Sequence, residues 1–253
     1  MKLFYTLLSG ILISTAALAQ TTIWSADFGD GCNQGQLANG FSGWSQSDLL
    51  NGNVANEWFV SATEAGMGSG NCGDGCLATG GTNRSLHVGN VLITYGGFPL
   101  AEADQGSAYN VGGLQGYGFT SHTDKRIESP VVDCSGFQNI SISFEYIEGG
   151  QTTMDNAVLH VFNGTSWGVL DDLAKTTPCP SGQGEWTDYT YALSSSFDGL
   201  SNLQFGFKWV NNDDGLGSDP SFAVDNILIT GDITTGIQTF KNDLKLVAKN
   251  GNL

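Results

Sequence analysis

One carboxylate stands inside an otherwise apolar segment near the end of the chain. Asp225 lies in residues 219–229, where alternating apolar side chains predict a strand that is covered on both faces. Its neighbours are Phe222, Val224 and Leu228 on one face and Ala223, Ile227 and Ile229 on the other. A buried carboxylate is costly unless it is paired, hydrogen-bonded or bound to a metal. Because Lys and Arg are scarce nearby, calcium is the first candidate partner, and backbone N–H donors at a sheet edge are the alternative.

The loop that precedes this strand carries three more carboxylates. Asp213, Asp214 and Asp219 lie within residues 211–219, which are mostly Asn, Asp and Gly. The run departs from the EF-hand pattern, because Leu216 stands where the turn glycine belongs and no Glu occupies the twelfth position. We predict that these three carboxylates bind a ligand, either a second calcium or sugar hydroxyls. A solvated turn built from ordinary turn residues is the alternative.

Tryptophans are the second type of candidate binding residue, because an exposed indole can stack on a sugar ring. The candidates are Trp44, Trp58, Trp167 and Trp186, and Trp58 is the one we predict to contact a ligand. A buried place in the core is the alternative for each of them, since aromatic side chains dominate the cores of β-sandwiches.

The sequence lacks the motifs of common hydrolases. Glycosidases of the laminarinase type carry Glu-x-Asp-x-x-Glu on one strand, since retaining chemistry needs two carboxylates about 5 Å apart. That run is absent, as are His-Glu-x-x-His and Gly-x-Ser-x-Gly, and His87, His122 and His160 are scattered. A Ser/His/Asp triad assembled from distant loops would leave no such spacing. The sequence therefore favours binding over catalysis, with a hydrolase as the weaker alternative.

Residues 1–19 have the composition of a secretory signal peptide. Lys2 supplies the positive start, the following residues are mostly apolar, and Ala17-Leu18-Ala19 fits the small-residue cleavage rule. No later apolar run approaches the roughly 20 residues that a membrane helix needs. We therefore expect export to a secreted or cell-surface location, without a transmembrane segment.

The balance of charges excludes one class of partner. Nine Lys and Arg against 25 Asp and Glu give a formal net charge of −16. Nucleic-acid binding needs a basic surface, which this chain lacks. Acidic loops rich in Gly and Asn suit calcium and neutral sugars, although surplus acid can also serve solubility alone.

Five cysteines in an exported chain predict disulfides. Cys72 and Cys76 are the principal candidates, because Cys72-Gly-Asp-Gly-Cys76 could close locally. Each could instead join Cys32 or Cys134, and the odd number leaves one thiol unpaired. A zinc site is the weaker alternative, since no second Cys/His pair stands at ligand spacing.

Alternation of apolar and polar residues indicates many short strands. It is clearest in residues 140–146, 187–193 and 203–209, with weaker candidates at 22–28, 57–61, 84–88, 126–132, 156–163 and 166–170. Gly, Asn and Asp separate these segments, and residues 66–82 and 90–125 read as long loops. The pattern predicts an all-β fold, a two-sheet antiparallel jelly-roll sandwich of the concanavalin- or galactose-binding-like type over residues 20–231.

Several short motifs follow one another in an order that resembles a known group of domains. They are Asp27-Phe28, Phe41-Ser42-Gly43-Trp44, Asn56-Glu57-Trp58, Ser85-Leu86-His87-Val88, Ile127-Glu128-Ser129-Pro130-Val131-Val132-Asp133, Ile142-Ser143-Phe144-Glu145-Tyr146, Gly184-Glu185-Trp186 and Phe222-Ala223-Val224-Asp225-Asn226-Ile227. Residues 22–231 resemble the MAM and cleaved-adhesin jelly-roll domains of exported surface proteins. The layout is also similar to jelly-roll carbohydrate-binding modules.

This resemblance implies a structural calcium shared by the first and last strands. The matching positions are Asp27 and Asp225, with Asp30 as a neighbour, although Asp27 stands where many members have Glu. Residues 232–253 read as a linker or a truncated C-terminal sorting segment. From Thr234 the chain resembles the lead-in to a type IX secretion sorting domain, which implies export by that route.

Together these observations predict a secreted, non-catalytic binding or adhesion module that is stabilised by calcium. Its expected partner is a glycan or a surface protein. The alternative is a carbohydrate-binding module that serves polysaccharide capture.

Overall fold

The computed structural model describes residues 20–32, 35–50, 55–76, 81–95, 98–102, 104–113, 122–180 and 183–234. The predicted signal peptide, residues 1–19, and residues 235–253 of the predicted tail lie outside the described residues. In the part of the chain that is described, no helix has the length and apolar surface needed to cross a membrane.

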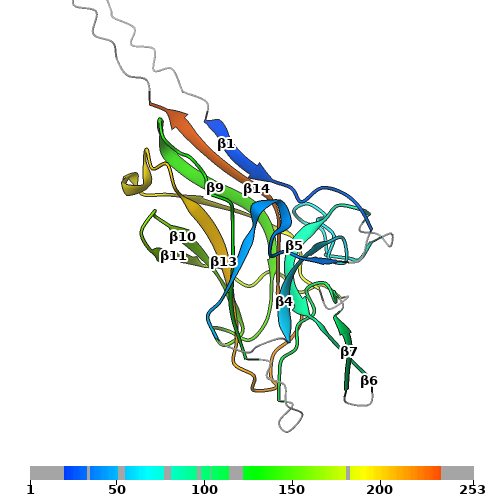
Figure 1. The fold of residues 1–253 in the computed structure, drawn as a ribbon. Helices are drawn as coiled ribbons and strands as arrows, with labels where there is room; N and C mark the ends of the chain where they lie inside the picture. Colours follow the sequence, from blue (N-terminus) through cyan, green and yellow to red (C-terminus); the bar gives the residue numbers. More distant parts are fainter. Residues whose placement is uncertain are drawn as a thin grey trace, which may run out of the picture.

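Two antiparallel sheets make up the sandwich, which confirms the predicted all-β fold (Figure 1). The larger sheet has the strand order β12 (Thr187–Ala192), β9 (Phe137–Glu148), β14 (Phe222–Ile233), β5 (Ser85–Asn90), β4 (Asn56–Ser61) and β2 (Gln36–Leu37), and β1 (Thr21–Ala26) also pairs with β14. The smaller sheet has the order β11 (Trp167–Asp172), β10 (Asn156–Phe162), β13 (Gln204–Asn211), β8 (Thr123–Glu128) and β3 (Ser45–Asp48).

Several elements fall where the sequence predicts only loop. The strands β6 (Leu92–Tyr95) and β7 (Phe98–Glu102) pair with each other inside the predicted loop of residues 90–125. The short strands β2 and β3 were also not predicted, because two polar edge residues or the sequence Ser-Gln-Ser-Asp give no apolar alternation. Helical turns in the described part of the chain are the 3-10 turns η1 (Phe41–Gly43) and η2 (Ser195–Phe197).

Aromatic side chains between the two sheets form the centre of the core. The rings of Phe144 in β9 and Phe207 in β13 meet edge-on with centroids 5.1 Å apart, and the centroid of Phe207 is 5.3 Å from that of Phe222 in β14. All three are buried. The inward residues of β9 and of the β13 region are those that the alternation predicts, namely Ile140, Ile142, Phe144, Tyr146, Leu203, Phe205, Phe207 and Trp209. Two amphipathic sheets therefore share one apolar interior.

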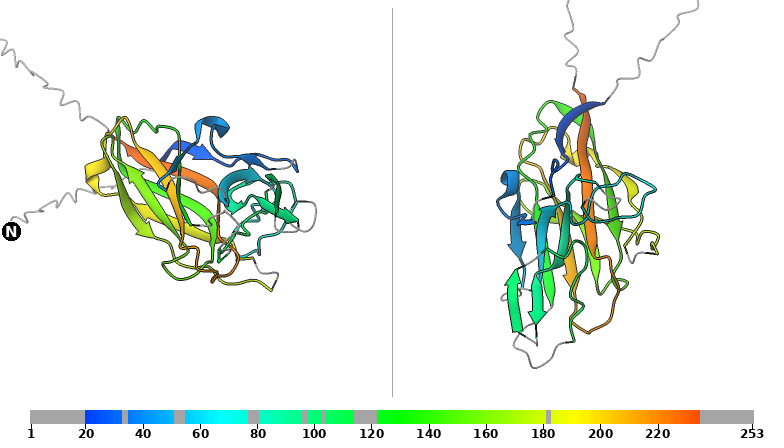
Figure 2. Two further views of the ribbon diagram at one scale, coloured as in Figure 1. Left: turned by 60° about the horizontal axis from the view of Figure 1, so that its bottom comes forward. Right: turned by 90° about the vertical axis from the view of Figure 1, so that its right-hand side faces the viewer.

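Strand β14 joins the beginning of the domain to its end. Its partners are β9, β5 and β1, and the pairing of Thr21 with Gly231 places the start of β1 beside the end of β14. Figure 2 shows β1 (blue) beside β14 (orange) from further directions. The strand continues to Ile233, beyond residue 231 where the sequence predicts the domain to end.

Truncating a central aromatic side chain tests this core. Phe207→Ala should lower the free energy of unfolding by about 3–5 kcal/mol, because it removes transfer energy and leaves a cavity. Leu216→Ala is the matched control; its side chain is 59% exposed, so the change should stay within about 0.5 kcal/mol. Urea titration followed by tryptophan fluorescence measures both, and equal effects would contradict this placement of the core.

Candidate functional site

Asp225 lies in the interior of the larger sheet, at an irregularity in β14. The pairing of β14 with β9 shifts register between Asp225 and Leu228, and Asn226 has a φ of 52°. The Asp225 side chain is buried and accepts two hydrogen bonds, from the Asn226 N–H and from Asn83 Nδ2, each 2.7 Å long. Gly66 lies directly against this carboxylate, since a Cβ at residue 66 would lie 1.9 Å from Asp225 Oδ2 and would force the Asp225 side chain to move.

The electrostatic environment of Asp225 is unfavourable to its ionised form. Burial raises the pKa of Asp225 to about 7, and the hydrogen bonds from Asn226 and Asn83 oppose this rise. The negative charges of Glu145 and Asp27 raise the pKa further. The carboxylate is thus partly satisfied by hydrogen bonds, but the charged groups that shift its pKa carry its own sign.

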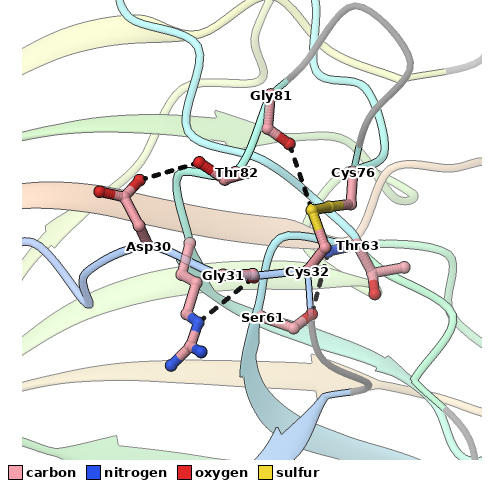
Figure 3. The surroundings of a disulfide bond; sticks show 9 residues. Asp30, Gly31, Cys32, Ser61, Thr63, Cys76, Gly81 and Thr82 are labelled. Carbon is pink, nitrogen blue, oxygen red and sulfur yellow. Dashed lines mark hydrogen bonds between the residues drawn. A yellow bond between two sulfur atoms is a disulfide. The ribbon is translucent and has the colours of Figure 1, made fainter.

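The other two predicted calcium ligands lie on the segment that follows β1. Asp27 is exposed, and its Oδ1 accepts a 3.3 Å hydrogen bond from the Gly29 N–H. Asp30 forms a backbone bridge with Asn83, and its side chain accepts a 3.2 Å hydrogen bond from Thr82 Oγ1 (Figure 3). Among the described residues, no group of three or more His, Cys, Asp and Glu side chains comes together to hold a metal. Calcium stays a prediction.

The disulfides connect segments that are distant in the sequence. Cys32 pairs with Cys76, which is one of the alternatives left open, and Cys72 pairs with Cys179. The local closure of Cys72 with Cys76 is therefore wrong. A backbone bridge between Cys72 and Glu185 holds Cys72 against the segment after β11, which carries Cys179, while Cys76 meets the loop after β1 (Figure 3). Cys134 is the free thiol, and it is buried.

The carboxylates of the acidic loop before β14 accept backbone hydrogen bonds, one from within the loop and two from the segment of residues 109–113. Asp213 Oδ1 accepts a hydrogen bond from the Gly113 N–H, and Asp214 Oδ1 accepts one from the Leu216 N–H. Asp219 Oδ1 accepts one from the Tyr109 N–H, 3.1 Å long. These bonds agree with the turn alternative, and ligand binding by Asp213, Asp214 and Asp219 stays a prediction.

Trp58 does not present a face to solvent, so the prediction that it contacts a ligand is wrong. Its side chain is fully buried, and its ring packs edge-on against Phe222 with centroids 6.1 Å apart. The core alternative is the correct one for Trp58, and Trp44 and Trp186 are buried as well. Trp167 is partly exposed, with the Arg126 guanidinium 4.1 Å above its ring.

A cleft of about 350 Å³ opens beside Asp27. It lies between β1, an edge of the larger sheet, and the turn η1, which leads into edge strand β3 of the smaller sheet. Its lining combines aromatic, hydroxyl and carboxylate groups: Trp24, Ser25, Ala26, Asp27, Phe28, Gly29, Phe41, Ser42 and Trp44. Sequence reasoning missed Trp24 and Phe41 as site residues, since they come from different elements that only the folded structure brings to one cleft.

A serine and a histidine of β5 adjoin an aspartate that follows β7, on the face of the larger sheet that points away from the core. His87 Nε2 lies 2.8 Å from Asp104 Oδ1, and Ser85 Oγ lies 3.2 Å from His87 Nδ1. Ser85 Oγ also donates to the Glu64 carbonyl oxygen. All three side chains are enclosed, with 1% or less of the His87 and Asp104 side chains exposed. A substrate has no access to this group, so the arrangement is structural rather than a serine-hydrolase site.

The opposite charges of His87 and Asp104 stabilise each other. Burial lowers the pKa of His87, but the adjacent Asp104 carboxylate outweighs it, so the pKa lies above its ordinary value. Burial raises the pKa of Asp104, whereas His87 and the hydrogen bonds from Ser61 and Gly106 hold it well below its usual range. The two residues therefore form a buried ion pair.

Two further buried carboxylates were missed by the sequence analysis. Burial raises the pKa of Glu64 to about 7 despite hydrogen bonds from Ser107 and Gln183. Burial likewise raises the pKa of Glu148 to about 7, although Lys175 Nζ donates to its Oε1 over 2.6 Å. The alternation could have revealed Glu148, because it continues the inward series of even-numbered residues through Tyr146.

Comparisons with known proteins find likeness of fold only. No protein family matches the chain, and no curated protein sequence matches it either. Among solved structures, the chain is similar to the K1 cleaved adhesin domain of Lys-gingipain from Porphyromonas gingivalis, with 12% identity, 83% of this chain and 98% of that chain covered, and a TM-score of 0.41.

Two other similar structures come from different kinds of protein. A Stig cyclase, Fisc from Fischerella sp. TAU, shares 13% identity over 85% of this chain and 99% of that chain, with a TM-score of 0.44. The CBM22-1–GH10 modules of a Clostridium thermocellum xylanase share 13% identity over 82% of this chain and 29% of that chain, with a TM-score of 0.35. Such low scores leave the function to be argued from the site.

The buried carboxylates predict an unusual dependence of stability on pH. Asp225, Glu64 and Glu148 have folded-state pKa values of about 7, above their ordinary values of 3.8, 4.5 and 4.5. Between those values the folded protein binds protons that the unfolded chain does not, so stability falls as pH rises from about 4.5 to about 8. The raised pKa of His87 acts in the same direction. The lowered pKa of Asp104 instead costs stability only on strong acidification.

Urea midpoints in EDTA should therefore be higher at pH 5 than at pH 8. Glu148→Gln should flatten this difference, because it removes one of the protons taken up on folding. Asp133→Asn, which replaces a solvent-exposed carboxylate, is the control and should leave the slope nearly unchanged. A midpoint that increases from pH 5 to pH 8 would contradict the assignment.

Proposed function

We propose that this protein is an extracellular, non-catalytic binding module of the adhesive type, with a glycan or a surface protein as its ligand. The observation that carries the proposal is the lining of the cleft beside β1. That lining holds aromatic rings, hydroxyls and a carboxylate, which bind ligands, and it includes no histidine, lysine or cysteine to act as base or nucleophile.

The distribution of reactive side chains supports binding rather than turnover. The Ser85–His87–Asp104 group is buried on the face of the larger sheet that points away from the core between the two sheets. The Ser85 hydroxyl donates its proton to the Glu64 carbonyl oxygen, and the His87 ring is hydrogen-bonded to the Asp104 carboxylate. A general base must reach the proton of a bound substrate, which an enclosed group does not.

An oxidising location is supported by the disulfides. Cys32–Cys76 and Cys72–Cys179 tie the long loop around residues 66–82 to two separate segments. Such bonds persist outside the reducing cytosol. A signal peptide at residues 1–19 and export by a type IX route complete the proposal.

Calcium at the junction of β1 and β14 is the proposed stabilising ion. Asp225 and Asp27 would supply the two carboxylates. The Asn83 side-chain amide donates to both Asp225 Oδ2 and the Gly66 carbonyl oxygen, which brings an amide and a carbonyl group close to Asp225. Calcium binds carboxylate, carbonyl, amide and water oxygens in flexible arrangements, so a mixture of these oxygen ligands suits it. The ion would offset the like charges that raise the pKa of Asp225, and Asp30 is the proposed neighbour.

Calcium should stabilise the wild-type protein and not the Asp225→Asn variant. At a concentration about 100 times its Kd, the ion should add about 2.7 kcal/mol to the free energy of unfolding after EDTA treatment. Asp232→Asn is the matched control on the same strand, and its response to calcium should equal that of the wild type. An undiminished response in Asp225→Asn would exclude this site.

The binding function is tested with the whole exported chain on two arrays in parallel, one of glycans and one of surface proteins. We expect saturable binding to members of one array, and no turnover on a broad panel of glycan and peptide substrates. Polysaccharide capture predicts binding to extended polysaccharides, whereas adhesion predicts binding to host-type glycans or proteins. Turnover on the panel, or saturable binding to neither array, would overturn the proposal.

A further inference from the structure

We propose that the cleft between β1 and η1 binds one neutral sugar residue, as a monosaccharide or as one unit of a longer glycan. This inference rests on the proposed binding function and names the ligand class and contact residues of its site. The cleft volume of about 350 Å³ lies at the small end of ordinary ligand pockets, roughly 300–1,000 Å³. It is therefore sized for a single ring with its immediate substituents.

Two partly exposed aromatic side chains offer the stacking surface. Trp24 and Phe41 line the cleft and are each partly exposed. Behind them, Trp44 and Phe28 are buried and brace the exposed rings, with centroids 6.1 Å apart for Trp24 and Trp44 and 6.4 Å for Phe28 and Phe41. An aromatic ring held from behind loses little freedom when the apolar face of a sugar packs on it.

The polar groups of the lining match a ring of hydroxyls. Ser25 and Ser42 are exposed and both donate and accept hydrogen bonds, and the exposed Asp27 carboxylate is an acceptor for hydroxyl donors. Among the described strands β1 pairs only with β14, so its other edge carries further backbone donors and acceptors. Residues 24–26 of β1 and residues 27–29 that follow it line the cleft without a break, so the backbone of this segment borders the opening.

The backbone on both sides of the cleft is held in an uncommon conformation. Phe28 has a φ of 55° and Ser42 a φ of 46°, which are left-handed values that non-glycine residues seldom adopt. These two residues come from opposite walls of the same cleft. Such conformations persist where the surrounding structure holds them, and they concentrate at ligand sites. The walls are therefore positioned in advance of binding.

The charge of the lining selects against other ligand classes. None of the lining residues is basic, and the chain carries a formal charge of −16, so an acidic sugar or a phosphate would be repelled. An aromatic cage for an organic cation needs rings that stand apart, so that the cation fits between their faces. The rings instead contact one another, with the centroids of Phe28 and Trp44 only 5.7 Å apart. The hydroxyls of Ser25 and Ser42 favour a polyol.

The test titrates neutral methyl glycosides and oligosaccharides into the whole protein by NMR and calorimetry. Trp24→Ala should weaken binding about tenfold through loss of the stacking surface, and Trp24→Phe, which keeps a ring, should retain part of it. Trp167→Ala is the matched control, because Trp167 is also a partly exposed strand tryptophan but lies on β11 of the smaller sheet. Its affinity should stay within twofold of the wild type.

A second readout covers the case in which Trp24→Ala does not fold. The indole N–H signal of Trp24 in the wild-type protein, assigned by its loss in Trp24→Phe, should shift on addition of sugar, and that of Trp167 should not. Sugar binding that leaves Trp24 and Phe41 unaffected would overturn this inference and leave the binding function intact. Binding in the cleft only by quaternary ammonium compounds, or only by an extended peptide along β1, would also overturn it.

Discussion

The pairing of β14 with three other strands is the constraint on which the rest of the structure depends. Because β9, β5 and β1 all pair with β14, its Asp225 lies inside the sheet rather than at an edge. The irregularity at Asn226 lets Asp225 accept hydrogen bonds from Asn83 and from its own strand. The same strand anchors β1, and the free edge of β1 becomes one wall of the cleft. Core, carboxylate and cleft are thus consequences of one set of pairings.

Burial of ionisable groups explains why reactive-looking residues are structural here. Removing a charge from water is costly, and a chain with so few cations has few ways to compensate. Glu148 forms an ion pair with Lys175, His87 forms one with Asp104, and Asp225 accepts hydrogen bonds from Asn83 and Asn226. Each of these side chains is engaged by a partner inside the fold, and the site that we propose for binding lies instead at the surface between β1 and η1.

Local alternation made the framework predictable, and it failed where strands were short or apolar on both faces. The inward series through Phe144 and Phe207 was correct, since each polar neighbour identifies the outer face of its strand. Trp58 was wrong as a contact residue because Trp58 and Phe59 are apolar neighbours on opposite faces of one strand, so the pattern does not identify the exposed one. The same alternation could have predicted that Glu148 at the end of β9 points inward. Glu64 lies outside the strands, so alternation could not predict its burial.

The sequence alone determined the all-β class, the inward faces of the long strands, the acidic charge balance and the absence of hydrolase motifs. These properties depend on neighbouring residues, whose side chains alternate with a period of two whatever the strand pairs with. Only the tertiary structure decided that Cys72 joins Cys179, that His87 meets Asp104, and that Trp24 and Phe41 line one cleft. Those contacts join residues far apart in the chain, so they exist only once strand order and register are set.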